Sequence, residues 1–444
     1  MRLVHLGLGN FFRAHQAWYT DQAPDAAGWG YAAYSGRSAG LASRLQAQGG
    51  RYTLITRAAE GDRFDQVSAI VRAHSAADHE AWLADLADPQ VRALTLTVTE
   101  AGYRRGGNGG LDRSDPQVSA DIEALRRDPR APVGSAPARI VAGLAARRIA
   151  DAGPLAVVPC DNLPDNAAAA RGVVLELAER VDPALAGWIA ESVGWVTTMV
   201  DRITPRTTDD DLASVLAVTG WADQAPVVTE PFSEWVLSGP FPGGRPRWPD
   251  AGATFTDDVT LYEQRKLWLL NGAHSLLAYT GSARGQATVA EALADPTSRG
   301  WLETWWSEAS PWLSLPPADV AAYRTALLER FGNPRMRHRL EQIAADGSQK
   351  LPVRILPALR LERAAGRIPL GAARVLGAWT VHLRGNGFAV QDAGAAGLVP
   401  LVQGGLSDAV RAVLRFLDPA LDDDQELRAA VLDAAAALDR GAGD

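Results

Sequence analysis

Short apolar runs with β-strand character alternate with helix-like stretches over roughly the first 160 residues, and this alternation constrains the fold more than any other feature. The candidate strands lie at residues 3–8, 30–34, 52–56, 93–99 and 155–158. Residues 135–152, just before the last candidate strand, carry Ile140, Val141, Leu144 and Ile149 at roughly helical spacing. Because strands that alternate with helices form a parallel sheet covered by helices, the pattern predicts an α/β fold.

The second half of the chain has a different, helix-like character. From about residue 257, the stretch TDDVTLYEQRKLWLLNGAHSLLAY begins with acidic and threonine capping candidates and continues without a proline. A proline- and glycine-rich stretch at 237–252 predicts a loop before this change. Because 444 residues exceed one ordinary core, we expect an α/β domain over residues 1–258 and a mainly α-helical domain over 259–444. Further helix-like patterns lie at 323–331, 335–345, 359–365, 372–383, 408–416 and 425–438.

The composition excludes several classes of protein. The net charge of -8 arises from acidic and basic residues mixed along the chain, so a nucleic-acid partner is not expected. No run approaches the roughly 18 apolar residues of a membrane span, and the N-terminus lacks signal-peptide features, so we expect a soluble, cytoplasmic protein. The single cysteine, Cys160, and seven histidines without ligand spacing predict no structural zinc site.

Two glycines directly follow the first candidate strand. In LVHLGLGNFFRAH, Gly7 and Gly9 stand between that strand and a helix-like stretch, where a Rossmann unit carries its phosphate turn. Phe12 occupies the third glycine position of GxGxxG. The context favours a dinucleotide-binding turn over a plain tight turn, because glycines let the backbone approach a pyrophosphate at the start of a helix.

The choice of dinucleotide is less clear from the sequence. The second candidate strand ends in YSGRS, which holds no acid to bind a ribose 2′-hydroxyl. Arg37 in this stretch could meet an adenine ring or a 2′-phosphate, or lie in solvent. Glu60 and Asp62 offer carboxylates further on, but the sequence does not place them against a ribose. We expect NAD and leave NADP open.

Lysine is rare in this chain: of 44 basic residues only two are lysines, and the first, Lys266, stands in KLWLLNGAH. Arginine stays protonated in proteins, whereas lysine can exchange a proton when its surroundings shift its pKa. On an α-helix at about 100° per residue, Asn271 lies roughly 140° and His274 about 80° round from Lys266. Oxidation of a secondary alcohol requires a base for the proton and donors for the developing carbonyl oxygen, and these side chains supply both.

Several motifs give the chain a family resemblance. KLWLLNGAH fits Lys-x4-Asn-x2-His, and the chain resembles the long-chain polyol dehydrogenases that include mannitol 2-dehydrogenase and fructuronate reductase. GLGNFFRAHQAWYTD, LTVTEAGY, CDNLPDN, TMVDRITP, TEPFSEW and DGSQKLP also resemble family motifs, in the family's order. The resemblance implies an expanded Rossmann domain with a mostly parallel sheet, followed by a mainly α-helical second domain. It also implies metal-independent hydride transfer between NAD(P) and the secondary alcohol or ketone of a linear polyol or aldonate.

The resemblance assigns the chemical step to four residues. Lys266 would be the general base in alcohol oxidation and the general acid in ketone reduction. Asn162 and Asn271 would bind the oxygen that develops charge, and His274 would orient the substrate and help hold the lysine. The structural alternatives are a chance lysine, a turn cap at Asn162, an asparagine that satisfies a backbone group and a hydrogen-bonded core histidine.

The resemblance also implies binding contacts. Asp201 would accept a hydrogen bond from a substrate hydroxyl or order the lysine; alternatively it is a structural partner of Arg202. The implied substrate contacts are Val200, Asp201 and Lys350. The implied cofactor contacts are Gly7, Gly9, Asn10, Phe11, Arg37, Thr99 and Glu100.

Three positions depart from the family pattern. Phe12 stands where histidine is common, Ala167 where glycine follows the second asparagine of the CDN motif, and Gln342 where mannitol-oxidising members tend to carry arginine. The first two bear on cofactor affinity more than on chemistry. Because HRLEQIAADGSQKLP resembles the uronate-reducing branch, the mannitol–fructose and mannonate–fructuronate pairs both remain open.

Two other classes of protein also fit. A dinucleotide-binding redox sensor without turnover would share the glycine turn, and a hydroxyacid or phosphogluconate-type dehydrogenase also joins a Rossmann domain to a helical one. For the polyol or aldonate dehydrogenase, the expected partner is a small molecule, namely a sugar alcohol, ketose or sugar acid. We expect a monomer or a small homo-oligomer.

Overall fold

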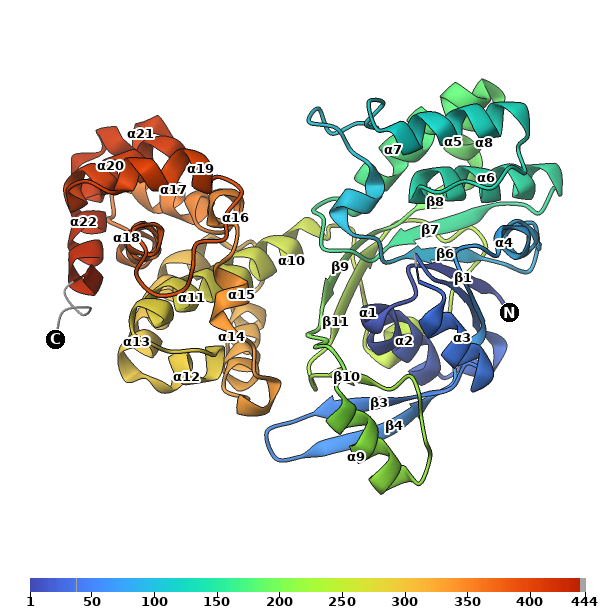
Figure 1. Ribbon diagram of the computed structural model, residues 1–444, viewed down its shortest axis with the longest axis horizontal. Coiled ribbons are helices and arrows are strands. Elements are labelled where there is room, and N and C mark those ends of the chain that lie inside the picture. The colour runs from blue at the N-terminus through green and yellow to red at the C-terminus, as the bar shows by residue number, and fades with distance from the viewer. Residues whose placement is uncertain (37, 440–444) are drawn as a thin grey trace. The chain divides into compact units, whose positions relative to one another are not determined.

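Two compact units make up the chain, Met1–Thr260 and Leu261–Asp444. The computed structural model describes residues 1–36 and 38–439. The first unit combines sheets with helices, and the second is built from helices (Figure 1). The predicted fold class, an α/β unit followed by a mainly helical one, is confirmed.

A six-stranded sheet forms the centre of the first unit. Its strand order is β5-β2-β1-β6-β7-β8, and every neighbouring pair is parallel. The order reverses at β1 and β6, and ligands of such doubly wound sheets bind outside the carboxyl ends of the strands at that point. The strands are β1 (Leu3–Leu6), β2 (Tyr31–Tyr34), β5 (Ile70–His74), β6 (Ala93–Leu96), β7 (Leu155–Pro159) and β8 (Val193–Trp195).

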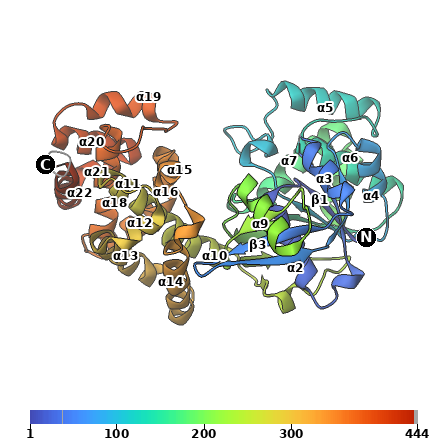
Figure 2. The ribbon, with the colours of Figure 1, turned by 60° about the horizontal axis from the view of Figure 1, so that its bottom comes forward.

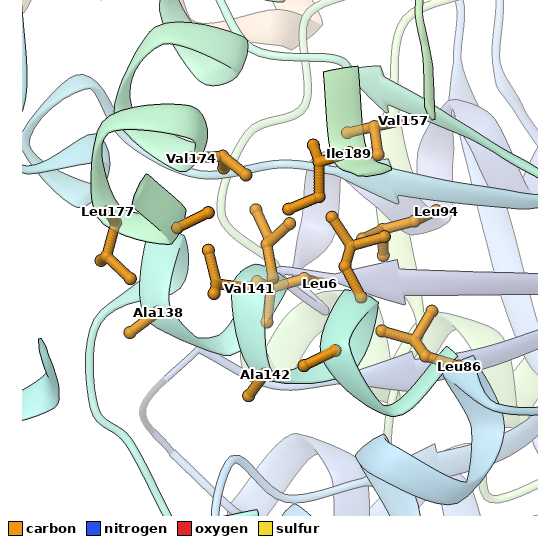
Figure 3. Close-up of a cluster of buried hydrophobic side chains, with 14 of the residues drawn as sticks. Leu6, Leu86, Leu94, Ala138, Val141, Ala142, Val157, Val174, Leu177 and Ile189 are labelled. Carbon is orange, nitrogen blue, oxygen red and sulfur yellow. The ribbon is translucent and has the colours of Figure 1, made fainter. Parts of the chain in front are cut away.

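Both faces of this sheet are buried at its centre: β1, β2, β6 and β7 are buried at every position, whereas the edge strand β5 has exposed residues. Along β1, Val4 and Leu6 belong to one hydrophobic cluster and Leu3 to another on the opposite face. Figure 3 shows the first cluster, in which Val141 of α6 lies beside Leu6 of β1 and Val174 of α7 belongs to the same group. Helices α1 to α3 cover the other face, and α4 to α8 belong to the first cluster (Figure 1).

Helices α5 to α8 each begin at a residue whose side chain caps the helix. Helix α6, for example, begins at the cap Ser135, whose hydroxyl accepts a hydrogen bond from the amide of Ala138, and Pro137 occupies its first turn. The helices of the first unit are α1 (Asn10–Ala14), α2 (Gln16–Gln22), α3 (Gly40–Ala47), α4 (His79–Leu86), α5 (Pro116–Arg127), α6 (Ala136–Ile149), α7 (Asn166–Val181), α8 (Pro183–Ser192) and α9 (Asp209–Thr219), with 3-10 turns η1 (Ala26–Gly28), η2 (Glu100–Tyr103) and η3 (Trp248–Ala251).

Two three-stranded sheets complete the first unit, in the orders β10-β3-β4 and β12-β11-β9. Residues 52–56, expected among the strands of the parallel sheet, belong instead to β3 of a small sheet, because β3 forms an antiparallel hairpin with β4. The strands are β3 (Tyr52–Arg57), β4 (Asp62–Val67), β9 (Thr197–Asp201), β10 (Val227–Thr229), β11 (Glu234–Ser238) and β12 (Thr254–Phe255).

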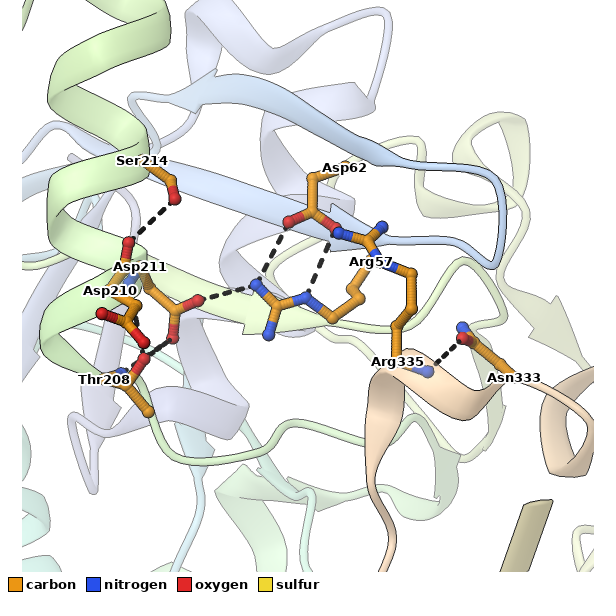
Figure 4. A network of polar contacts seen from close by, with 8 residues as sticks. All are labelled: Arg57, Asp62, Thr208, Asp210, Asp211, Ser214, Asn333 and Arg335. Atoms are coloured by element: carbon orange, nitrogen blue, oxygen red, sulfur yellow. Dashed lines mark hydrogen bonds and ion pairs between the residues drawn. The ribbon is translucent and has the colours of Figure 1, made fainter. Parts of the chain in front are cut away.

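A polar network joins this hairpin to helix α9. The guanidinium of Arg57 lies 3.2 Å from the Asp62 carboxylate and 2.6 Å from that of Asp211 (Figure 4). Asp211 also closes a capping box with Thr208 at the start of α9. Asp62, one of the two carboxylates that the sequence could not place, is therefore the ion-pair partner of Arg57.

The second unit is a helical assembly around α18. This helix is buried on nearly all sides and packs against α11, α13 and α22 (Figures 1 and 2). Gly377 permits the close approach of α22, because a Cβ there would lie 2.8 Å from the Val431 carbonyl oxygen. The helices are α10 (Thr260–Arg265), η4 (Lys266–Gly272), α11 (Ala273–Ala283), α12 (Val289–Ala294), α13 (Pro296–Ala309), α14 (Pro317–Phe331), α15 (Leu340–Ala344), α16 (Gly347–Arg354), α17 (Leu356–Ala364), α18 (Leu370–Leu383), α19 (Ala395–Leu398), α20 (Leu406–Leu417), α21 (Pro419–Asp423) and α22 (Gln425–Asp439), with 3-10 turns η5 (Ser310–Trp312), η6 (Pro334–Met336) and η7 (Val399–Val402).

The helix expected over residues 335–345 is broken. Arg337 adopts a left-handed conformation, with φ of 47°, directly after η6. The backbone at Arg339 then forms a β-bridge with Thr288, so helix α15 begins only at Leu340. A backbone pairing with a distant segment has replaced the first turns of the expected helix.

Candidate functional site

The glycine turn after β1 adopts a conformation that only glycine supports. Gly7 has φ of +112°, and a Cβ there would lie 2.1 Å from the carbonyl oxygen of Thr97. The Thr97 hydroxyl also donates a hydrogen bond of 2.7 Å to the Gly7 carbonyl oxygen. Gly9 is extended and precedes α1, a helix of five residues. Glycine is therefore required at position 7, because the segment that follows strand β6 lies too close for a side chain. A Cβ at Gly9 would make only an ordinary contact, 3.5 Å from the Gly7 carbonyl oxygen.

Phe12 fills the space that a third glycine would leave. Its ring stacks on the imidazole of His5 in β1, with centroids 3.5 Å apart and planes 8° from parallel. Burial lowers the pKa of His5 to about 3, so this imidazole is neutral at physiological pH. An aromatic ring thus joins α1 to the sheet, in place of the close backbone packing that the glycine motif provides elsewhere.

A cavity of about 340 Å³ opens beside this turn. It lies at the carboxyl ends of β1, β2 and β6, where a doubly wound sheet binds its ligand. Of the expected cofactor contacts, Gly7 and Thr99 line it. The lining residues are Leu6, Gly7, Leu8, Gly36, Thr97, Val98, Thr99, Gly102, Arg104, Gly134, Ser135, Ala136 and Arg139.

Four of the other expected cofactor contacts do not line the cavity: Gly9, Asn10, Phe11 and Glu100. The Asn10 side chain accepts a hydrogen bond of 2.7 Å from Arg13, and the Phe11 ring stacks on His15 with centroids 4.9 Å apart. Glu100 is exposed at the start of η2. Arg37 lies outside the described residues.

The turn after β7 carries Asn162. The preceding Asp161 accepts hydrogen bonds from the Tyr103 hydroxyl and from the Leu163 amide, and burial raises the pKa of Asp161 to about 6. Asn162 itself is exposed. The second asparagine of the motif, Asn166, has a structural role, since its side chain exchanges hydrogen bonds of 2.9 and 3.0 Å with the backbone of Thr198.

Val200 and Asp201 end strand β9. Both are buried, and Asp201 pairs with Glu234 in the antiparallel register of β9 and β11. The next residue, Arg202, donates hydrogen bonds to the carbonyl oxygens of Ala14 and Glu230 and lies over the ring of Trp18. The Arg202 guanidinium therefore donates hydrogen bonds to backbone carbonyl oxygens, which the sequence did not suggest as its partners.

In the second unit, Lys266 begins a π-helical turn that extends to Gly272. The expected 100° per residue is therefore wrong for this segment. A π-helix bonds residue i to i+5, so Asn271 returns close to the side of the helix that Lys266 occupies. Lys266 is half-buried, whereas Asn271 and His274 are buried. The three motif residues thus share one helical stretch, with Lys266 and Asn271 closer in direction than α-helical spacing allows.

Two adjacent tryptophans of α13 support this π-helical turn. The indole N–H groups of Trp305 and Trp306 donate hydrogen bonds of 2.9 Å each to the carbonyl oxygens of Trp268 and Leu269. These two indole groups supply hydrogen bonds to carbonyl oxygens where the π-helical turn interrupts the i→i-4 hydrogen bonds of the α-helix. Gly272 allows the contact, because a Cβ there would lie 2.9 Å from the Trp305 ring. The two tryptophans are adjacent in the sequence and could have been noticed there, but their role was not predicted.

His274 lies in an aromatic environment. Its ring centroid is 4.8 Å from that of Phe331 and 4.8 Å from that of His338. Burial and the charge of Arg330 lower the pKa of His338. The surroundings therefore restrict the orientation of the His274 ring through packing on two sides.

Lys350 lies on α16, which packs against the π-helical turn. Its ammonium donates a hydrogen bond of 2.6 Å to the Ala345 carbonyl oxygen, and burial and Arg354 lower the pKa of Lys350. Arg354, which the sequence did not single out, donates to the Asn271 carbonyl oxygen (3.4 Å) and the Ser275 hydroxyl (3.3 Å). In a chain so rich in arginine, no sequence signal marks it.

The described part of the chain lacks two features that would indicate another class of site. Among residues 1–36 and 38–439, no three His, Cys, Asp or Glu side chains gather as a metal ion would require. Within the same ranges, no helix combines the length and the apolar character needed to cross a bilayer.

Comparison with known families gives two matches. The model described as the mannitol dehydrogenase Rossmann domain matches residues 1–250, and the model described as the mannitol dehydrogenase C-terminal domain matches residues 258–436. Together the matched regions cover almost the entire chain. They meet close to the division between the two compact units.

Individual relatives agree with this result. A D-mannonate oxidoreductase from Escherichia coli (strain K12) is 40% identical over 370 residues, which cover 81% of this chain and 75% of the relative. A crystal structure of D-sorbitol dehydrogenase in substrate-free form has a TM-score of 0.91 and 29% identity, covering 99% of this chain and 94% of its own. The ternary complex of Pseudomonas fluorescens mannitol 2-dehydrogenase with NAD and D-mannitol has a TM-score of 0.79 and 32% identity, covering 99% and 92%.

Proposed function

The chain belongs to the mannitol dehydrogenase family, and on this premise we propose that it is an NAD(P)-dependent oxidoreductase for the secondary alcohol or ketone of a linear polyol or sugar acid. The observation that carries the proposal is the π-helical turn that carries Lys266 and Asn271 and continues directly into α11, which carries His274. When bound, the nicotinamide ring exchanges a hydride with the substrate carbon. The cavity at the ends of β1, β2 and β6 fits such a dinucleotide, because glycine backbone and a helix start line it.

Lys266 is the proposed general base. In alcohol oxidation its unprotonated amine accepts the hydroxyl proton as the substrate carbon loses a hydride; in reduction its ammonium returns the proton to the carbonyl oxygen. The amide groups of Asn271 and Asn162 donate hydrogen bonds to that oxygen while charge develops on it. His274 orients the substrate, supported by the rings of Phe331 and His338.

This chemistry needs no metal ion in the proposal. Amine and amide groups replace the Lewis acid, since together they exchange the proton and stabilise the oxygen. Val200 and Asp201 complete the substrate site in the proposal, with the Asp201 carboxylate accepting a hydrogen bond from a substrate hydroxyl.

Between a polyol and a sugar acid, the cations on α16 favour the acid. Lys350 and Arg354 lie one helical turn apart, and Arg354 contacts the backbone of Asn271. Across residues 1–36 and 38–439, neither forms an ion pair with a carboxylate. Burial lowers the pKa of Arg354 to about 10, so it remains charged at neutral pH. Two cations without carboxylate partners among the described residues, on a helix that packs against the π-helical turn, can bind a substrate carboxylate.

Steady-state kinetics test this choice of substrate. We expect kcat/KM for mannonate or fructuronate to exceed that for mannitol or fructose by about 10- to 100-fold, the effect of one or two charge-assisted hydrogen bonds. Arg354→Met should remove most of this difference through KM. Equal kcat/KM values for the sugar acids and the sugar alcohols would contradict the predicted preference for the acid.

Variants of the two lysines test the mechanism. Lys266→Ala should lower kcat by about 100- to 10 000-fold, the usual contribution of general acid–base catalysis, while dinucleotide binding stays intact in fluorescence titration. Lys266→Arg should be equally inactive, because arginine keeps its proton. Lys350→Met is the matched comparison, and it should raise KM without abolishing kcat. An active Lys266→Ala enzyme would refute the assignment, and dinucleotide binding without turnover of any polyol or sugar acid would favour a redox sensor.

A further inference from the structure

The cavity at the carboxyl end of the parallel sheet has an unusual balance of charge. Among the described residues, its lining contains two arginines, Arg104 and Arg139, and no aspartate or glutamate. Arg104 is neutralised, since its guanidinium lies 2.8 Å from the Asp115 carboxylate. Of these two arginines, Arg139 is therefore the one that contributes an uncompensated positive charge to the cavity.

Arg139 is a buried cation without a carboxylate partner among the described residues. Its side chain is 3% exposed, and within residues 1–36 and 38–439 it forms no ion pair. Its guanidinium lies over the rings of Trp82 (5.0 Å) and Tyr34 (6.0 Å), and its Nη2 has no hydrogen-bond partner within the same ranges. Burial lowers the pKa of Arg139 to about 10, so the charge persists at neutral pH. A buried charge without a counterion is costly, and an anionic ligand would offset that cost.

The position of Arg139 indicates which part of a dinucleotide is concerned. Its Nη1 donates a hydrogen bond of 3.2 Å to the carbonyl oxygen of Ser35, the residue that follows β2. In doubly wound sheets the adenosine ribose lies at the end of this strand, where an acid binds the 2′-hydroxyl of NAD and an arginine accommodates the 2′-phosphate of NADP.

The described residues after β2 offer no such acid. The chain continues from Tyr34 with Ser35 and Gly36, and Ser38 follows. Two other carboxylates of this unit are engaged elsewhere: Asp85 accepts hydrogen bonds from Tyr34 and Arg72, and Asp62 pairs with Arg57. A ribose 2′-hydroxyl would therefore lack its usual acceptor in this cavity, whereas a 2′-phosphate would meet a positive potential.

We propose that this cavity selects the 2′-phosphorylated dinucleotide NADP(H) over NAD(H), with the buried Arg139 as the source of the attraction. The inference rests on the proposed function, because it concerns the cofactor of that same reaction. It identifies a residue on α6, about a hundred positions from the end of β2, as a determinant of cofactor choice.

Fluorescence titration of the complete chain tests the proposal. NADPH should bind about 10- to 100-fold more tightly than NADH, the effect of charge-assisted interactions with one phosphate group. The advantage should shrink as salt is added, because screening weakens attraction to a dianion. Binding of NADH as tight as that of NADPH, together with turnover, would overturn the inference and leave the proposed function intact. Absence of binding and of turnover with both dinucleotides would overturn the two together.

A substitution at Gly36 provides a second, independent measurement. A Cβ added at Gly36 would meet no described atom within 4 Å, and the backbone there has no positive φ, so the position accepts a side chain without strain. Gly36→Asp adds the missing carboxylate, and we expect it to reverse the preference towards NADH. Gly36→Asn, of the same size without charge, is the matched control and should keep the NADPH preference. Equal behaviour of the two variants would contradict an electrostatic origin.

Arg139→Met removes the charge itself. We expect it to weaken NADPH binding about tenfold or more while NADH binding changes little. Because Arg139 is buried against Tyr34 and Trp82, circular dichroism must first establish that the variant is folded. Gly36→Asp decides the question should Arg139→Met not fold. A folded Arg139→Met protein with an undiminished NADPH advantage would assign the selection to other residues.

Discussion

The glycine turn of the first unit and the lysine-bearing turn of the second obtain their geometry in different ways. At Gly7, a positive φ and the contact with Thr97 leave room only for glycine, so the residue type itself reports the conformation. At Lys266, an ordinary helical sequence adopts a π-helical turn whose carbonyls are bound by Trp305 and Trp306, nearly forty residues away. The first geometry is visible in a motif, and the second depends on packing.

This difference predicts where each region is vulnerable. The glycine turn should lose its conformation when a Cβ is added at Gly7, because the added atom would overlap the Thr97 carbonyl oxygen. The π-helical turn should respond to changes in α13, because two tryptophans of α13 bind its carbonyl oxygens. Three experiments test the contrast, in decreasing order of expected effect.

Gly7→Ala should have the largest effect. A strained φ and the overlap with the Thr97 carbonyl should together lower the free energy of unfolding by about 3–5 kcal/mol and abolish dinucleotide binding. Gly9→Ala is the matched control: its φ is extended and its Cβ would lie 3.5 Å from the nearest atom. Thermal unfolding should therefore show Gly9→Ala close to wild type, and a similar loss in both variants would mean that the turn as a whole, not the Gly7 contact, is sensitive.

Trp305→Phe should have the next largest effect. The change leaves the Trp268 carbonyl oxygen without its buried donor, which should lower the free energy of unfolding by about 2–3 kcal/mol. Because the π-helical turn carries Lys266 and Asn271, kcat should fall with little change in dinucleotide affinity. Trp301→Phe on the same helix is the control, since its described contacts are with the guanidinium groups of Arg284 and Arg374, which phenylalanine can also stack against. Equal kcat values in the two variants would mean that the hydrogen bond from Trp305 to the π-helical turn does not affect catalysis.

The pH dependence of stability at Asp161 should be the smallest effect. Burial raises its pKa from the ordinary 3.8 to about 6, so between these pH values the folded protein holds more protons than the unfolded chain. The free energy of unfolding should therefore fall as pH rises through this window. The full shift corresponds to about 3 kcal/mol, and solvent screening of this partly exposed side chain reduces the expected change to about 1–2 kcal/mol. Urea unfolding from about pH 4 to 7 should show a shallower decline for Asp161→Asn. Parallel curves would mean that Asp161 titrates normally.

Asp161 also qualifies the comparison between the two regions. It belongs to the first unit and stands in a recognisable motif, yet its environment is made by Tyr103, a residue of a different segment. In both units, therefore, a motif identifies which residues to consider. The pKa of such a residue depends on the distant side chains that bury it.

The apolar pattern predicted most of the parallel sheet, because strands buried on both faces are continuous apolar runs. It could not assign residues 52–56 to a separate sheet, since a hairpin partner such as β4 has a mixed, half-exposed pattern. It also missed the break after Met336, where Arg339 pairs with Thr288 across the fold. Both errors arose from backbone pairing with segments that local periodicity does not reveal.

The candidate site shows the same division. Lys266, Asn271 and His274 were identified from residue type and spacing, but the angles between them were wrong because an α-helix was assumed. Arg139 and Arg354 were not identified, because in a chain with 42 arginines among 44 basic residues another arginine carries no signal.

The sequence by itself determined the fold class, the order of the two folds, the glycine turn and the family, since these follow from local preferences and from motifs read in order. The tertiary structure decided the π-helical turn, the buried charges of Arg139 and Arg354 and the raised pKa of Asp161. The physical reason is that burial and hydrogen bonding are properties of a residue's neighbours in space, and those neighbours come from distant parts of the chain.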